Sequence, residues 1–270
     1  MKNLPIRLLT ESYSLVKRSG LLETSVGSQL FTSAYFLYKR YVEDGLQDVI
    51  RLHPSLLRGG NVLDIGANLG YTAQVLARST GPGEHVYAFE PEPFNYAILR
   101  RMSAQPEFTG RITAVQSAVG AAEGTVQLWQ NMHHHADHRV ITDQFRATAA
   151  PVDCVSVPMV TIDGFLERNP GPVSFVKIDV QGFELPVCEG MKATLERNPD
   201  LTIVLEYAPS AMRELGFDPT RLVKFLADRG FDCFLIGPHG KLSAGIPRIE
   251  DGGYVDLLCS RRPIPCDHNA

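Results

Sequence analysis

The sequence predicts an α/β domain with a mainly parallel sheet that helices cover on both faces. From residue 61 onward, short apolar runs alternate with segments of helical periodicity. The runs, such as NVLDI at 61–65, are almost continuously apolar, as in strands that are buried on both faces. The first run leads through a glycine-containing loop into a helix, which is typical of the start of a parallel α/β sheet.

Residues 1–57 are predicted to form a helical extension before this domain. Over 28–52, apolar residues recur at helical spacing, and Gly45 can divide the segment into two helices. Pro54 and the Gly59–Gly60 pair then end it. The extension is rich in aromatic residues. Packing against the main domain is one interpretation, and a lid over a substrate pocket is the other.

The main domain is predicted over 58–262, followed by a tail at 263–270. The stretch 124–160 interrupts the alternation, because no clear helix separates its two strands, and it contains the sequence NMHHHADHR. An insertion near the mouth of such a sheet is a natural place for substrate contacts. Strands are expected at 61–65, 85–89, 112–119, 125–129, 155–160, 174–180, 201–206, 231–236 and 254–258, and helices at 71–79, 93–102 and 221–229.

Composition and charge exclude several classes of protein. The 270 residues include 26 Lys or Arg and 30 Asp or Glu, and the net charge of -4 does not fit a polycation that coats nucleic acid. The 5 cysteines are odd in number and show no CxxC spacing, so reduced thiols are expected. The sequence has neither a signal-peptide pattern nor an apolar run of transmembrane length. We expect a cytoplasmic protein that binds neither membranes nor nucleic acid, and the oligomeric state is not predicted.

The loop after the first strand, in VLDIGANLGYTA, has the form of a ligand-binding turn. Gly66 and Gly70 allow a tight turn, and the helix that follows presents free backbone N–H groups. Asn68 stands where a dinucleotide fingerprint has its second glycine, so a ligand without a pyrophosphate fits better. Asp64 would repel phosphate and suits a cation or an ammonium group.

Glu90 follows the second strand, in HVYAFEPEP. A carboxylate at this place can accept hydrogen bonds from both hydroxyls of a ribose. Together with Asp64, it predicts a ligand with a ribose and a positive charge, and S-adenosylmethionine has both. The structural alternative is an ordinary turn between strand and helix with a surface Glu.

Further acids close two later strands. Lys177 and Asp179 interrupt the apolar run FVKIDV, and charges within a buried strand are costly unless they are paired or functional. Glu206 ends the next strand in the same way. Asp179 and Glu206 are therefore expected at the crevice where open α/β sheets bind ligands. A Lys177–Asp179 pair that only stabilises the fold is the alternative.

Taken together, VLDIGANLGYTA, YAFEPEP, FVKIDVQGFELPVCEGM and IVLEYAP resemble the FkbM-type S-adenosylmethionine-dependent methyltransferases over about residues 58–237. The resemblance implies a Rossmann-like sheet of seven strands with the last strand antiparallel. Gln181 departs from the family's usual Glu, which leaves the role of this position open. The cofactor residues that the resemblance implies are Asp64, Gly66, Ala67, Asn68, Gly70, Tyr71, Glu90, Ser117, Ala118 and Asp179, with adenine expected near Ser117 and Ala118.

The implied activity is methyl transfer from S-adenosylmethionine to a hydroxyl of a small molecule, such as a sugar or secondary metabolite. Asp179, Glu206 and His135 are the candidate catalytic groups, because a positioned base assists a hydroxyl nucleophile. The histidine run at 133–138 is interpreted as a solvated loop, as a substrate or catalytic site, or as a metal site, and no metal is assigned. A non-catalytic S-adenosylmethionine-binding protein and a nicotinamide-dependent oxidoreductase are the alternative functions.

Overall fold

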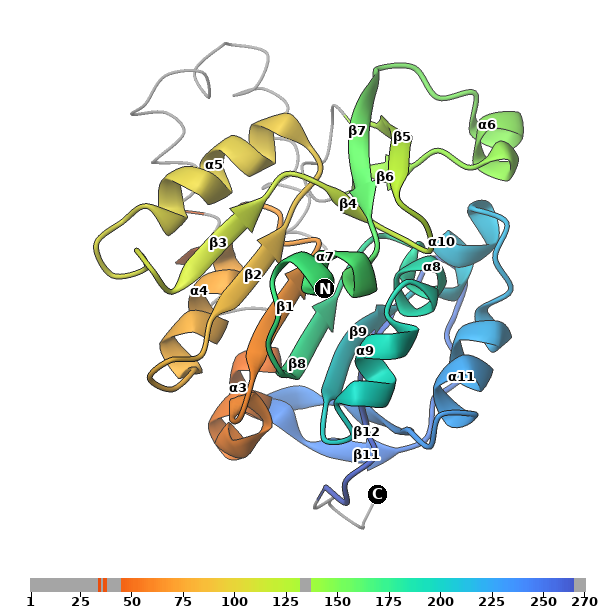
Figure 1. Cartoon of the computed structure of the whole chain (residues 1–270). Helices are drawn as coiled ribbons and strands as arrows, with labels where there is room; N and C mark the ends of the chain where they lie inside the picture. Colours follow the sequence, from red (N-terminus) through yellow and green to blue (C-terminus); the bar gives the residue numbers. More distant parts are fainter. Residues whose placement is uncertain (1–33, 35, 38–44, 132–136, 265–270) are drawn as a thin grey trace.

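The computed structural model describes residues 34, 36–37, 45–131 and 137–264. Its main body is an eight-stranded sheet, and a smaller four-stranded sheet lies beside it (Figure 1). The order in the large sheet is β11-β10-β12-β9-β8-β1-β2-β3. Its strands are β1 (Asn61–Ile65), β2 (Val86–Phe89), β3 (Ile112–Val115), β8 (Val173–Ile178), β9 (Thr202–Tyr207), β10 (Asp232–Ile236), β11 (Leu242–Ala244) and β12 (Val255–Ser260).

The large sheet is mainly parallel, as predicted. Five neighbouring strands pair in parallel, in the order β3, β2, β1, β8 and β9. Strand β12 pairs antiparallel with both β9 and β10. The expected count of seven strands is wrong, because β11 adds an eighth strand that pairs antiparallel with the edge strand β10. This strand has three residues, of which only Leu242 is buried, so it leaves no apolar run in the sequence.

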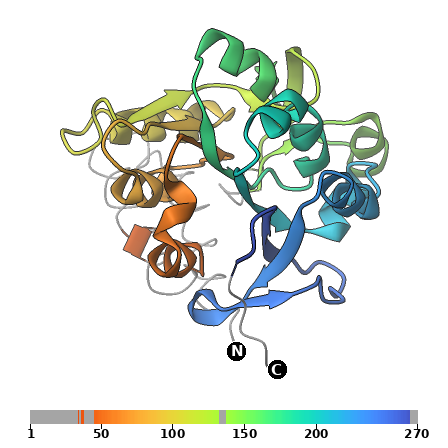
Figure 2. The same ribbon diagram turned by 60° about the horizontal axis from the view of Figure 1, so that its bottom comes forward.

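Helices cover both faces because the strands are apolar on both sides. All six residues of β8 are buried, and successive strand residues belong to two different cores. Figure 2 shows the two helical layers on opposite sides of the sheet. One face packs against α3 (Gly45–Leu52), α4 (Tyr71–Ser79) and α5 (Pro93–Ser103), and the other packs against α7 (Ile162–Arg168), α8 (Glu184–Glu189), α9 (Lys192–Arg197), α10 (Pro209–Glu214) and α11 (Pro219–Ala227).

The second sheet occupies the stretch that interrupts the alternation. The run predicted as one strand over 112–119 is divided, because the chain leaves β3 and enters the small sheet at Ala118. Contrary to expectation, a helix does lie between the strands here, and Thr142 caps it by accepting a hydrogen bond from the N–H of Phe145. This sheet has the order β4-β7-β5-β6, with β4 (Ala118–Val119), β5 (Gly124–Trp129), β6 (Arg139–Val140), β7 (Cys154–Val160) and the helix α6 (Asp143–Ala149).

Of the helix expected over 28–52, the structure gives a continuous description from Gly45, where α3 begins. Val49 and Ile50 of α3 are buried in the core on the α4 side, so this part packs against the main domain. Two short 3-10 helices complete the described elements: η2 (Pro54–Leu57) follows α3, and η3 (Pro238–Gly240) precedes β11. Within the described ranges, no helix has both the length and the apolar character that crossing a membrane requires.

Candidate active site

The loop after β1 has the predicted turn, and the fold itself requires its glycines. Gly66 has φ 84°, and a Cβ on it would lie 1.8 Å from the carbonyl oxygen of Asp179. Gly70 has φ 93° and caps α4, and a Cβ there would lie 2.5 Å from the Cε atom of Met102. The close backbone approach that Gly66 permits is therefore an approach to the chain's own strand end.

Asn68 lies between these glycines in an unusual conformation. Its φ is 51°, which is uncommon for a residue other than glycine. The backbone N–H donates to Oε2 of Glu90 at 2.8 Å, while the buried Oδ1 atom has no hydrogen-bond partner in the described part of the chain. A buried polar atom without a partner is costly, so this oxygen is available to a ligand that carries a donor.

Glu90 lies next to this loop, as the spacing predicts. Its Oε1 accepts the N–H of Glu92 at 2.9 Å and its Oε2 accepts that of Asn68, and the residue is only 5% exposed. Burial raises the pKa of Glu90 to about 8, although both backbone donors oppose the shift. Each oxygen keeps a second lone pair, so the fixed carboxylate can still accept hydroxyl groups.

Asp64 and Lys177 lie directly opposite each other on β1 and β8. Asp64 is 1% exposed, and its Oδ2 has no hydrogen-bond partner among the residues described. Burial raises the pKa of Asp64 to about 7, while the ammonium of Lys177 acts in the opposite direction. The pair places a carboxyl group and its countercharge at the carboxyl ends of the central strands, where open α/β sheets bind ligands.

Four carboxyl groups act on Lys177. Its Nζ lies 3.2 Å from Oδ2 of Asp179, and Asp64, Glu206 and Asp256 contribute at longer range. Burial lowers the pKa of Lys177, but the four acids together raise it by more than burial lowers it. The net pKa lies above its usual value, so the ammonium stays charged. With four acids around one ammonium, this part of the described structure has an excess of carboxyl groups over basic groups. That excess suits a cationic ligand.

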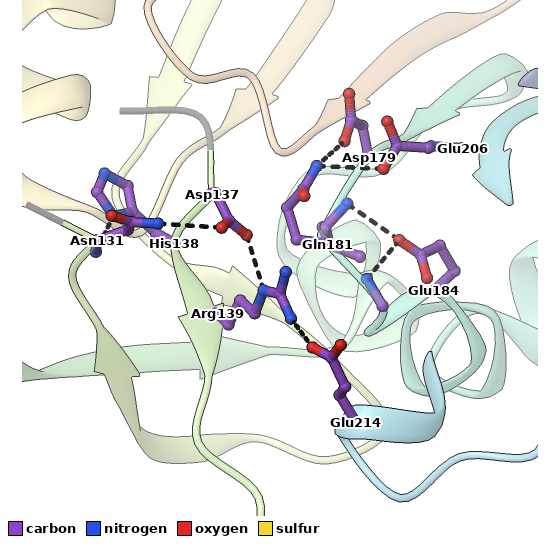
Figure 3. A network of polar contacts seen from close by, with 11 residues as sticks. Asn131, Asp137, His138, Arg139, Asp179, Gln181, Glu184, Glu206 and Glu214 are labelled. Carbon is purple, nitrogen blue, oxygen red and sulfur yellow. Dashed lines mark hydrogen bonds and ion pairs between the residues drawn. The ribbon is translucent and has the colours of Figure 1, made fainter. Parts of the chain in front are cut away.

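Gln181 joins the two acids that were predicted to be catalytic. Its Nε2 donates to Oδ1 of Asp179 at 3.0 Å and to Oε1 of Glu206 at 3.2 Å (Figure 3). Gln181 has φ 54°, and Glu184 supports this turn by accepting the N–H groups of Val180 and Gly182. Gln181 is not among the predicted site residues. The signal that could have found it is its place directly after a strand with two internal charges.

Asp179 and Glu206 therefore come together, as the sequence predicts, but their surroundings differ. Asp179 is ion-paired with Lys177, and its side chain is 36% exposed. The pKa of Glu206 is raised well above its usual value, first by burial and then by Asp179, with Lys177 opposing. When ionised, Glu206 is a strong base, since a raised pKa means a higher affinity for a proton.

The remaining predicted cofactor residues lie near the strand ends in different surroundings. Ala67 is 4% exposed, and its N–H donates to the carbonyl of Phe89. Tyr71 begins α4, and its ring lies 5.6 Å from that of Phe36 in the N-terminal extension. Ser117 and Ala118 lie where the chain passes from one sheet to the other, and the Ser117 hydroxyl donates to the carbonyl of Pro158. That hydroxyl supports the junction of the two sheets.

The histidine-rich segment is described only in part. His135 lies outside the described residues, so its predicted role stays a prediction. Asp137 accepts hydrogen bonds from Nδ2 of Asn131 at 3.0 Å and from Nε of Arg139 at 2.7 Å. Arg139 also pairs with Glu214 at the end of α10 (Figure 3). The ranges that the structure describes contain no group of three or more His, Cys, Asp or Glu arranged to hold a metal ion.

Comparisons with known proteins agree with this geometry. The model of the "Methyltransferase FkbM domain" matches residues 64–233. The chain is 24% identical over 227 residues to methyltransferase sdnD of Sordaria araneosa, covering 74% of this chain and 82% of that protein. It is 26% identical over 187 residues to hexuronic acid methyltransferase AglP of Haloferax volcanii, covering 68% and 69%.

A solved structure supports the fold. The O-methyltransferase from Bacillus cereus in complex with SAH superposes with a TM-score of 0.50 at 13% identity, over 93% of this chain and 98% of that one. At this level of identity the likeness concerns the fold alone.

Proposed function

Because the chain belongs to the FkbM methyltransferase family, we propose that it transfers a methyl group from S-adenosylmethionine to a hydroxyl of a sugar or secondary metabolite. The observation that carries this proposal is the excess of buried carboxyl groups over the ammonium of Lys177 at the carboxyl ends of β1, β8 and β9. S-adenosylmethionine carries a sulfonium and an ammonium group, and both favour such surroundings.

The described residues fit this cofactor at three points. Glu90, fixed by two backbone N–H groups, would accept the ribose hydroxyls. The orphaned Oδ2 of Asp64 and Oδ1 of Asn68 would each accept a hydrogen bond from the methionine part or from a water molecule beside it. The family and the fold of its relatives favour this cofactor over a nicotinamide dinucleotide.

When bound, S-adenosylmethionine supplies an activated methyl group, and this chain has to orient the acceptor and take up its proton. We assign Glu206 as the base and Asp179 as the group that orients the hydroxyl. As the acceptor is methylated, its hydroxyl proton would pass to the carboxylate of Glu206, while Asp179 would hold the hydroxyl in place. A positioned base of this kind raises the rate of such a reaction by about 10²–10⁴-fold.

Gln181 and Lys177 hold the two acids in position. The Gln181 amide donates one hydrogen to each carboxylate, so it fixes the distance between them. The ammonium of Lys177 forms an ion pair with Asp179 at 3.2 Å, which holds this carboxylate in position. The ion pair on Asp179 and the raised pKa of Glu206 support a division of tasks in which one acid orients the hydroxyl and the other accepts its proton.

The proposal is tested by methyl transfer from radiolabelled S-adenosylmethionine to a panel of hydroxylated acceptors, with and without EDTA. We expect transfer to a sugar or polyketide hydroxyl that a chelator does not reduce. Loss of activity in EDTA that a divalent ion restores would contradict the metal-free mechanism. Cofactor binding without transfer to any acceptor of the panel would favour the non-catalytic alternative.

A further inference from the structure

A second cavity, of about 390 Å³, lies over the small sheet. It is lined by residues from four elements: Trp129 at the end of β5, Arg139 in β6, Phe145 in α6 and Glu214 at the end of α10. The loop 149–152 completes the wall, and Val152 is 71% exposed. None of these residues takes part in the cofactor site or in the proposed proton transfer.

One wall of the cavity is aromatic. The rings of Trp129 and Phe145 lie 5.7 Å apart with their planes tilted by 52°. The guanidinium of Arg139 lies 6.0 Å from the centre of the Phe145 ring. Rigid aromatic faces with a polar group at their edge bind ligands that are apolar on one side and polar on the other.

The opposite edge is polar and carries a negative balance. Arg139 is held between Asp137 and Glu214, so its positive charge is already matched. Among the residues that line the cavity, two carboxylates stand against one guanidinium, a formal charge of minus one. Carboxylates accept hydrogen bonds and repel anions, so this edge suits hydroxyl groups and disfavours a second carboxylate on the ligand.

An apolar cluster links the aromatic wall of the cavity to the loop after β8. Trp129 and Phe145 share an apolar cluster with Val180 and Phe183, which flank Gln181 and Gly182 in the chain. Glu214 ends α10, the six-residue helix that follows β9, and six helical residues span roughly 9 Å. Figure 3 shows Arg139 and Glu214 of the cavity on the same side of the molecule as Gln181 and the acids at the strand ends.

We propose that this cavity binds a neutral sugar ring of the acceptor, adjacent to the part that receives the methyl group. A pyranose places its C–H face on the aromatic wall and its hydroxyls on Asp137, Arg139 and Glu214. A uronate meets repulsion at this edge, and a purely apolar ring forms no hydrogen bonds with its polar groups. The assignment rests on the proposed function and specifies its substrate class as a neutral glycoside.

The chain offers a direct readout, since its 1 tryptophan is Trp129 in the cavity wall. Titration of the wild-type protein with maltose, followed by tryptophan fluorescence, is expected to give a saturable change in the absence of any cofactor. A glucuronide of the same size is expected to bind at least about fivefold more weakly, because a like charge at close range costs about 1 kcal/mol or more. Cyclohexanol is expected to give no saturable change.

Asp137→Asn removes one negative charge with little change in shape, so it should raise the affinity for the glucuronide and narrow the difference between the affinities for the glucuronide and for maltose. Glu196→Gln, an exposed position on α9, is the matched control and should change neither. Tighter binding of the glucuronide than of maltose to the wild type, or no fluorescence response to any sugar, would overturn the assignment. Because this readout needs neither cofactor nor turnover, its failure is distinguishable from failure of the proposed methyl transfer.

Discussion

The loops after β1 and after β8 start at neighbouring strand ends, and they hold acidic side chains in different ways. Each contains a residue other than glycine with positive φ, Asn68 in the first and Gln181 in the second. In the first loop, a backbone N–H fixes the acid Glu90, and the Asn68 side-chain oxygen has no partner within the described structure. In the second loop, the side chain itself fixes two acids. The comparison separates a binding loop, built on the backbone, from a reaction loop, built on side chains.

The largest expected effect comes from breaking the contact between the two loops. Gly66→Ala places a Cβ against the Asp179 carbonyl, where backbone on both sides blocks relaxation. We expect a loss of more than about 3 kcal/mol in the free energy of unfolding, measured by urea denaturation. Gly59→Ala is the matched control, since Gly59 has a similar φ of 89° but nothing within 4 Å, and it should cost about 1–2 kcal/mol. Equal effects of the two variants would contradict the close approach.

The next effect concerns the reaction loop and its partner on β9. Glu206→Gln keeps the shape of the side chain and removes its ability to accept a proton. We expect kcat to fall about 10²–10⁴-fold while the affinity for S-adenosylhomocysteine stays within about threefold. Single-turnover kinetics and calorimetry measure the two quantities. If Asp179→Asn abolished turnover and Glu206→Gln did not, the two roles would have to be exchanged.

A smaller effect tests the bridge between the acids. Gln181→Glu keeps nearly the same size but removes both hydrogen-bond donors. Asp179 and Glu206 then face a third carboxyl group where the amide was. We expect kcat to fall about tenfold, with the acid limb of the pH profile moved to higher pH, because loss of a donor to the ionised form raises the pKa of these carboxylates. A residue that only fills space would leave this pH profile unchanged.

A further effect is a pH dependence of stability. Folding raises the pKa of Asp64 and Glu184 to about 7 and that of Glu90 to about 8. At a pH between the pKa of the unfolded chain and that of the folded protein, the native state therefore holds more protons than the unfolded state. The stability that these groups contribute is complete below the unfolded pKa and is lost as the pH rises through 7 to 8. We expect the free energy of unfolding to fall by about 2 kcal/mol or more from pH 5.5 to 8.5.

The variant Glu184→Gln should flatten that slope, and the exposed Glu196→Gln should not. Denaturation in urea at pH 5.5, 7.0 and 8.5 measures both variants against the wild type. A stability that rises with pH over this range would contradict the burial of these acids.

The sequence predicts the parallel strands and the acids that close them, because both produce local patterns. NVLDI and SFVKIDV are apolar runs whose length and order indicate buried strands, and they place Asp64, Asp179 and Glu206 at one edge. Strand β11 and the division of 112–119 escape prediction, because a short edge strand and a change of sheet depend on tertiary pairing.

The polar contacts between distant residues escape prediction for a related reason. Gln181 contacts Glu206 across 25 positions, and Arg139 contacts Glu214 across 75. No spacing rule connects such residues, since their proximity is decided by how the strands and loops pack. Sequence patterns therefore locate the acids, whereas the groups that position them become visible only in the folded chain.

The central claim is that the crevice between the loops binds S-adenosylmethionine through Glu90. Calorimetric titration of S-adenosylhomocysteine into the wild type and into Glu90→Gln tests it most directly. We predict one binding site in the wild type and an affinity at least tenfold lower in the variant, because hydrogen bonds to a charged acceptor are worth about 1.5–3 kcal/mol each. Equal affinities of the two proteins, both correctly folded by circular dichroism, would contradict the assignment.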